Sequence, residues 1–153
     1  MATSTLLQYL QADDGSGTAL GVSPSNRRQV ERYVASAAIA KNDLVAFDFA
    51  KSTDGEIALT VRKADSGSAA SICAVGFALE AAAAAGDEIN VTVAGVHVSA
   101  NVAGAVAKGD RLSISAVAGQ ADTYVNSDTV PIIGYAIEDD TANVASVMVI
   151  KQF

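Results

Sequence analysis

Two short fragments of the sequence occur twice and in the same order, and this repetition restricts the fold more than any other feature. Residues 39–45 (IAKNDLV) resemble residues 106–112 (VAKGDRL), and residues 76–80 (GFALE) resemble residues 134–138 (GYAIE). An alternating, valine-containing segment follows each copy of the second fragment. The repetition predicts two copies of one β-unit, at about 39–98 and 106–150.

Both fragments have a simple physical meaning. The Lys-x-Asp sequence predicts a turn that leads into a strand, because Asp and Gly are favoured in turns. The glycine of the second fragment lets the aromatic residue that follows it pack close to a neighbouring backbone.

Alternation of apolar and polar residues predicts several half-buried strands. The predicted inward side chains are Ile57, Leu59, Val61, Ile89, Val91, Val93, Leu112 and Ile114. Val96 and Val98 continue on the opposite parity, which predicts a bulge or a tight bend at Ala94-Gly95. Residues 147–150 predict a final strand that is apolar on both sides.

Turn signals separate these segments, and the larger apolar residues are mostly β-branched, with 18 Val and 9 Ile. The turns are predicted at residues 53–55, 65–67, 86–87, 109–110 and 118–119. Short strands spaced in this way predict an all-β fold, either a small sandwich or a barrel. Residues 79–85 are rich in alanine, so a short helical turn or a bulging loop is expected there.

The first part of the chain differs from the rest. Residues 1–26 contain turn and linker residues where a packed domain would alternate, so they predict an N-terminal arm, and residues 27–153 predict the β-domain. The arm still carries four apolar side chains that could be buried against a partner: Leu6, Leu7, Tyr9 and Leu10.

No catalytic, cofactor-binding or metal-binding residues are predicted. His97 and Cys73 are the only residues of their types, which excludes the usual zinc ligand sets. Alternation places His97 on a strand surface, so its replacement by glutamine is expected to change stability little. Cys73 lies in an apolar run and is expected to be a core residue. Carboxylate pairs, such as Asp139-Asp140, fall in predicted turns.

The net charge of −7 argues against a nucleic-acid or membrane partner, because phosphate binding needs clustered Lys and Arg. The one basic cluster is Arg27, Arg28 and Arg32, interrupted by Glu31. It is interpreted as a solvated strand edge, with docking on an acidic partner as the alternative.

Residues 85–96, 107–112 and 133–136 resemble the capsid decoration, or cement, proteins of tailed phages. These segments show a Gly-acid turn, an alternating valine strand, a second Gly-Asp turn and a late Gly-aromatic-Ala. The resemblance implies a non-enzymatic virion protein, made in the host cytoplasm, that binds the outer capsid surface and stabilises it. It also implies a homotrimer whose partner is the major capsid protein. From its own residues, the arm is expected to contact the major capsid protein or a neighbouring protomer, with packing on its own domain as the alternative.

Two other interpretations remain open. The chain could be another self-assembling structural protein, such as a head-fibre base, a tail component or a surface-layer module. It could also be a trimeric β-rich enzyme, for example a nucleotide hydrolase, although no phosphate-binding loop is found in the sequence.

Overall fold

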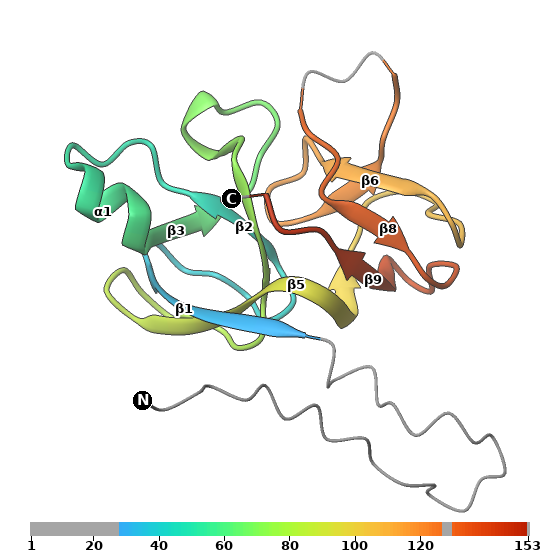
Figure 1. The fold of residues 1–153 in the computed structure, drawn as a ribbon, viewed down its shortest axis with the longest axis horizontal. Coiled ribbons are helices and arrows are strands. Elements are labelled where there is room, and N and C mark those ends of the chain that lie inside the picture. The colour runs from blue at the N-terminus through green and yellow to red at the C-terminus, as the bar shows by residue number, and fades with distance from the viewer. Residues whose placement is uncertain (1–27, 127–129, 153) are drawn as a thin grey trace, which may run out of the picture.

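The computed structural model describes residues 28–126 and 130–152. Its first five strands close into a barrel in the order β1-β3-β2-β4-β5, with β5 returning to β1 (Figure 1). The β1–β3 pair is parallel and the other pairs are antiparallel. These strands are β1 (Gln29–Ala35), β2 (Leu44–Phe47), β3 (Thr60–Lys63), β4 (Ala74–Ala78) and β5 (Glu88–Asn101).

A second lobe is built on the far half of β5, which runs on beyond the barrel (Figure 1). Its order is β5-β9-β8-β6-β7, and every pair is antiparallel. A parallel bridge between Val102 and Ala121 brings the end of β5 back to β7. The added strands are β6 (Arg111–Ile114), β7 (Ala121–Thr123), β8 (Gly134–Ala136) and β9 (Val144–Val149).

The two lobes confirm the predicted pair of β-units. The strand order β3-β2-β4-β5 in the first lobe recurs as β7-β6-β8-β9 in the second. Local hydrogen bonds recur too: the Ala40 amide donates to the Asp43 carboxylate at 2.8 Å, and the Ala107 amide donates to Asp110 at 2.9 Å. The second half of β5 takes the place in the second lobe that β1 has in the first.

One strand shared by two lobes explains the burial of the core. A first cluster of side chains fills the barrel, including Ile89, Val91 and Val93. A second cluster joins Leu44 and Phe77 of the barrel wall to buried residues of the second lobe. All five residues of β4 are therefore buried, because one face of this strand lines the barrel and the other lies under the second lobe.

The strand predicted from the alternation of Ile57, Leu59 and Val61 is wrong at its beginning. Residues Asp54–Leu59 form the helix α1, and only Thr60–Lys63 form β3. Thr53 caps the helix, since its hydroxyl accepts a hydrogen bond from the Glu56 amide and donates one to the Glu56 carboxylate. Leu59, predicted to point inward, is 60% exposed. Local capping therefore outweighs a short run of alternation.

Two further expectations about strands are tested. The final strand is buried on one face and not on both, since Val147 and Val149 are buried while Met148 and Ile150 are partly exposed. Residues 79–85 form a loop, as one of the two predicted alternatives, and it is held by a bridge between Ile39 and Ala82. The predicted bend in β5 is present, with Gly95 at a φ of 87°.

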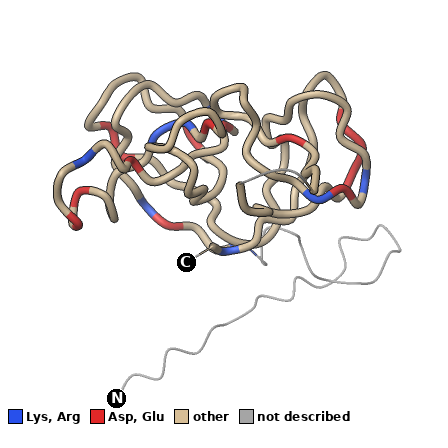
Figure 2. The backbone as a smooth tube through the Cα atoms, turned by 90° about the horizontal axis from the view of Figure 1, so that it is seen from above, with Lys and Arg blue, Asp and Glu red and all other residues tan. Residues whose placement is uncertain are grey.

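The end of the described chain returns to β1. The Lys151 ammonium lies 2.8 Å from the Glu31 carboxylate, which also accepts a hydrogen bond from the Tyr33 hydroxyl. Lys and Arg are scattered among Asp and Glu along the molecule (Figure 2). Within residues 28–126 and 130–152, charge therefore does not single out a broad basic face.

Candidate functional site

His97 is buried, which corrects its prediction as a strand-surface residue. Its imidazole stacks on Phe77 with 5.2 Å between ring centroids. The Nδ1 atom lies 3.1 Å from the Thr92 hydroxyl, and the Nε2 atom lies 3.2 Å from the Asn42 side-chain oxygen. Alternation does place His97 opposite Val96, but Phe77 of β4 and Asn42 of the turn before β2 lie against that face, so it is not in water.

These contacts assign the proton on the ring. The Asn42 oxygen can only accept a hydrogen bond, so Nε2 carries the proton and donates it, while Nδ1 accepts from the Thr92 hydroxyl. Burial of the ring lowers the pKa of His97 to about 4, and the positive charges of Arg28 and Lys41 add to this effect. His97 is therefore neutral at pH 7.

This burial predicts a loss of stability in mild acid. The ordinary pKa of histidine is 6.5. Between pH 6.5 and about 4, His97 therefore binds a proton in the unfolded chain but stays neutral in the folded chain. The contribution of His97 to the free energy of unfolding is fully present above pH 6.5 and is lost as the pH falls towards 4. From pH 7 to 4.5 we expect a loss of roughly 2–3 kcal/mol from His97 alone.

Urea denaturation at both pH values measures this loss, with His97→Gln as the comparison. The variant should be less stable at pH 7, because it loses a buried ring stacked on Phe77, and should lack the histidine contribution to acid sensitivity. An identical drop in the variant and the parent protein would show that His97 has no part in it.

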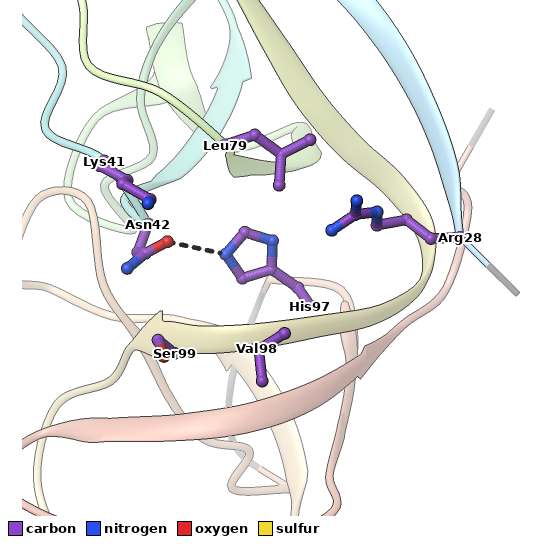
Figure 3. A pocket seen from close by; sticks show the side chains of 7 residues that line it. All are labelled: Arg28, Lys41, Asn42, Leu79, His97, Val98 and Ser99. Atoms are coloured by element: carbon purple, nitrogen blue, oxygen red, sulfur yellow. Dashed lines mark hydrogen bonds between the residues drawn. The ribbon is translucent and has the colours of Figure 1, made fainter. Parts of the chain in front are cut away.

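A pocket of about 260 Å³ opens beside His97 at the junction of the two lobes (Figure 3). We call it the junction pocket. It is lined by Arg28, Lys41, Asn42, Leu79, His97, Val98 and Ser99. Figure 3 shows Arg28 and Lys41 approaching the imidazole from different sides, with Leu79 above it. At this volume the pocket suits a small group better than a drug-sized molecule.

The junction pocket is positively charged. Its lining holds Arg28 and Lys41 but no Asp or Glu, although the whole chain has a net charge of −7. Neither cation takes part in an ion pair within residues 28–126 and 130–152, where Arg32, Arg62, Lys63 and Lys151 do. The pocket therefore has two cationic side chains without a partner acid in the described part of the chain.

The floor of the junction pocket is held rigidly. Asn42 has a left-handed backbone with a φ of 70°, at the position that Gly109 occupies in the second β-unit. Asparagine tolerates this conformation better than most residues, and here its amide also contacts His97. The next residue, Asp43, is buried and binds both Lys63 and Asn101. Because Asn101 lies on β5, this carboxylate ties the turn to the strand that both lobes share.

Cys73 is exposed, so its prediction as a core residue is wrong. It falls between the short 3₁₀ turn Ala69–Ser71 and β4, where the chain is still at the surface. The carboxylates Asp139 and Asp140 accept hydrogen bonds from the backbone amides of the 106–108 turn, as turn residues do. Within the described residues no group of three or more potential metal ligands is found.

The predicted contact residues Leu6, Leu7, Tyr9 and Leu10 lie outside the residues that the structure describes, as does Arg27. Arg28 was predicted only as part of a basic cluster and residues 41–43 only as a turn, and no sequence pattern indicated that they lie together. One feature of the sequence could have pointed to the pocket: the first fragment has Asn42 where its second copy has Gly109. Among the described residues, no helix has the length and apolar character needed to cross a membrane.

The sequence and the fold were compared with those of known proteins. The family model described as phage cement protein matches residues 22–151. A search of curated proteins finds no match. Among solved structures, the head fibre gp8.5 N base of bacteriophage phi29 is similar, with a TM-score of 0.52 and 15% identity over 80% of this chain and 94% of that chain. At that identity the likeness shows the fold alone.

Proposed function

The chain belongs to the phage cement protein family, and we propose that it binds the outer surface of a phage capsid through the major capsid protein and stabilises the shell there. The observation that carries this proposal is the family match over residues 22–151, which includes both β-units. The protein is a capsid-associated structural component of the virion. We further propose that it is made in the host cytoplasm and has no catalytic activity.

The physical character of the described domain supports this role. A protein that reinforces a shell needs rigid faces more than a cleft. Here one cluster of buried side chains spans both lobes, and the junction pocket is small. The backbone amide of Gly119 in the second lobe also donates to the Ala64 carbonyl of the first at 2.8 Å. The two lobes can therefore transmit load as one body.

Cosedimentation with purified, expanded capsids tests the proposal. The protein should pellet with the shells in a saturable manner, and electron microscopy should place added density on the outside. Absence of saturable binding, or density on the inner wall, would refute it. A thermal-shift screen with nucleotides tests the proposed lack of enzymatic activity, since a substrate that binds the folded state raises the melting temperature.

The fold likeness to a head-fibre base favours a second candidate, a capsid-bound base that carries a fibre. Both candidates bind the shell, so the capsid assay does not separate them. Density that ends at the two lobes in micrographs of decorated capsids favours the cement role. A filament that projects from each bound copy would favour the fibre base.

We also propose that the protein forms a homotrimer. An apolar surface, here called the β8–β9 face, supports this proposal. Tyr135 and Met148 are cross-strand neighbours that are 42% and 36% exposed, and Ile137 and Ile150 follow each of them two residues later. Closed symmetry could bury such a face in an assembly.

Light scattering at micromolar concentration should give the mass of a trimer. Tyr135→Glu should shift the mass towards that of the monomer, because a charge in a closed apolar contact is costly. Val117→Glu is the matched control, since Val117 is 55% exposed and lies outside this face. A monomeric parent protein would contradict the trimer. A Tyr135→Glu variant that stays trimeric would show that the interface does not include the β8–β9 face.

A further inference from the structure

We propose that the junction pocket binds a carboxylate group of the major capsid protein, either an acidic side chain or the chain terminus. This inference rests on the proposed function, because it names the chemistry by which that partner is recognised. The pocket lies where β1 begins, at the junction of the two lobes, and opens to the surface beside exposed Val98.

The charge of the junction pocket favours an anion. Arg28 and Lys41 both line the pocket without an acid among its lining residues, and neither forms an ion pair in the described part of the chain. A bound anion can interact favourably with both positive charges. Guanidinium and ammonium groups both form strong charge-assisted hydrogen bonds to carboxylates.

The neutral imidazole forms part of a fixed lining. His97 adds no third charge, because its Nε2 proton is already donated to Asn42 and its pKa is low. An anion therefore interacts with Arg28 and Lys41, while His97 and Asn42 form a fixed wall. Ser99 adds a hydroxyl to the lining, in a left-handed conformation with a φ of 65°. Such a preformed lining lowers the cost of ordering on binding.

The size and polarity of the junction pocket favour a single carboxylate. A volume of about 260 Å³ holds one small anionic group, and Leu79 and Val98 supply apolar contact beside it. This combination fits a carboxylate next to aliphatic carbon, as in Asp, Glu or a chain terminus. A nucleic-acid backbone fits less well, because it presents a row of phosphates and needs a row of cations. Elsewhere along the chain, acidic residues lie among the basic ones (Figure 2).

An acid from this chain itself is the other source of the same chemistry. Asp13 and Asp14 precede Arg28 by few enough residues to reach the pocket, since an extended chain spans roughly 3.3–3.6 Å per residue. We commit to the capsid protein, because a two-cation pocket in a protein of net charge −7 provides a localised attraction for an acidic partner.

The test measures capsid affinity by cosedimentation for four proteins: the parent, Arg28→Gln with Lys41→Gln, Lys51→Gln with Lys108→Gln, and Asp13→Asn with Asp14→Asn. The second pair is the matched control, because it removes the same charge away from the pocket. We expect the pocket variant to bind roughly tenfold to a hundredfold more weakly, and the other two to bind as the parent does. Circular dichroism confirms that each variant is folded.

Four results overturn the proposal. Undiminished binding by the pocket variant removes any role for the pocket, and equal losses in the pocket and control variants indicate general charge attraction only. An equal loss in the Asp13, Asp14 variant assigns the pocket to this chain's own acids. A parent protein that does not bind capsids refutes the proposed function itself, and with it the capsid source. In that case acetate-dependent shifts of the His97 and Asn42 resonances, absent with chloride, still report an anion site.

Discussion

Replacing Gly76 by alanine is expected to unfold most of the protein, and replacing Gly134 is expected to do nearly the same. A β-carbon on Gly76 would lie 2.8 Å from the carbonyl carbon of Thr92 and closer still to its oxygen. A β-carbon on Gly134 would meet the carbonyl group of Met148 in the same way. Both obstacles are backbone atoms inside a sheet, so neither can move without breaking the pairing of β4 with β5 or of β8 with β9.

We expect each substitution to cost about 4 kcal/mol or more, a large part of the stability of an ordinary domain. Urea denaturation followed by circular dichroism measures this cost. Gly55→Ala is the control, since nothing lies within 4 Å of a β-carbon there and the residue is in α1. Alanine at position 55 should be neutral or slightly stabilising. A stable Gly76→Ala protein would mean that β4 and β5 do not approach as described.

Deleting residues 1–22 is expected to leave the β-domain folded and trimeric while capsid binding weakens roughly a hundredfold, as the loss of two buried apolar anchors would cause. This prediction rests on the proposal that residues 1–26 order on the capsid protein or on a neighbouring protomer. Leu6, Leu7, Tyr9 and Leu10 are the proposed contacts. Coupled ordering of such a segment gains apolar burial and loses chain entropy in the same step.

Cosedimentation of the truncated and full proteins measures the effect. A finer comparison replaces Leu6 and Leu10 by serine, with Gln8 and Gln11 replaced by alanine as the control. The leucine variant should reproduce most of the loss, and the glutamine variant should bind normally. A truncated protein that decorates capsids with unchanged affinity would leave the arm without a role in attachment.

The two β-units were predictable because the repeated fragments contain residues that the conformation of the backbone requires. The glycine of each second fragment is required by a close carbonyl, and the aspartate of each first fragment closes a turn onto a backbone amide. These needs are local, so they leave a mark in the sequence. The order of the strands within each unit leaves no such mark and was not predicted; the structure gives it as β3-β2-β4-β5 and β7-β6-β8-β9.

His97 was misplaced for a reason that no local pattern could reveal. Alternation distinguishes the two faces of a strand, but it does not say whether each face is covered. Here the face opposite Val96 is covered by segments distant in the sequence, so it is also buried. Phe77, which stacks on His97, lies on β4. Asn42, which accepts the hydrogen bond from its Nε2 atom, lies in the turn before β2.

The junction pocket was out of reach of sequence analysis for the same reason. Arg28, Lys41 and Ser99 are far apart in the chain and meet only because β1, the 41–43 turn and β5 converge. The helix α1 was missed because three alternating apolar residues are too few to outweigh the Thr53 cap. Cys73 was misjudged because an apolar run can lie partly outside a strand.

If this protein reinforces a phage capsid from outside, decorated capsids should withstand heating better than bare ones. Expanded, DNA-filled capsids lacking the protein are heated with and without saturating amounts of it, and release of DNA is followed with a fluorescent dye. Added protein should raise the release temperature, because a ligand that binds only the intact shell stabilises it. An unchanged release temperature on fully decorated capsids would contradict the cementing role.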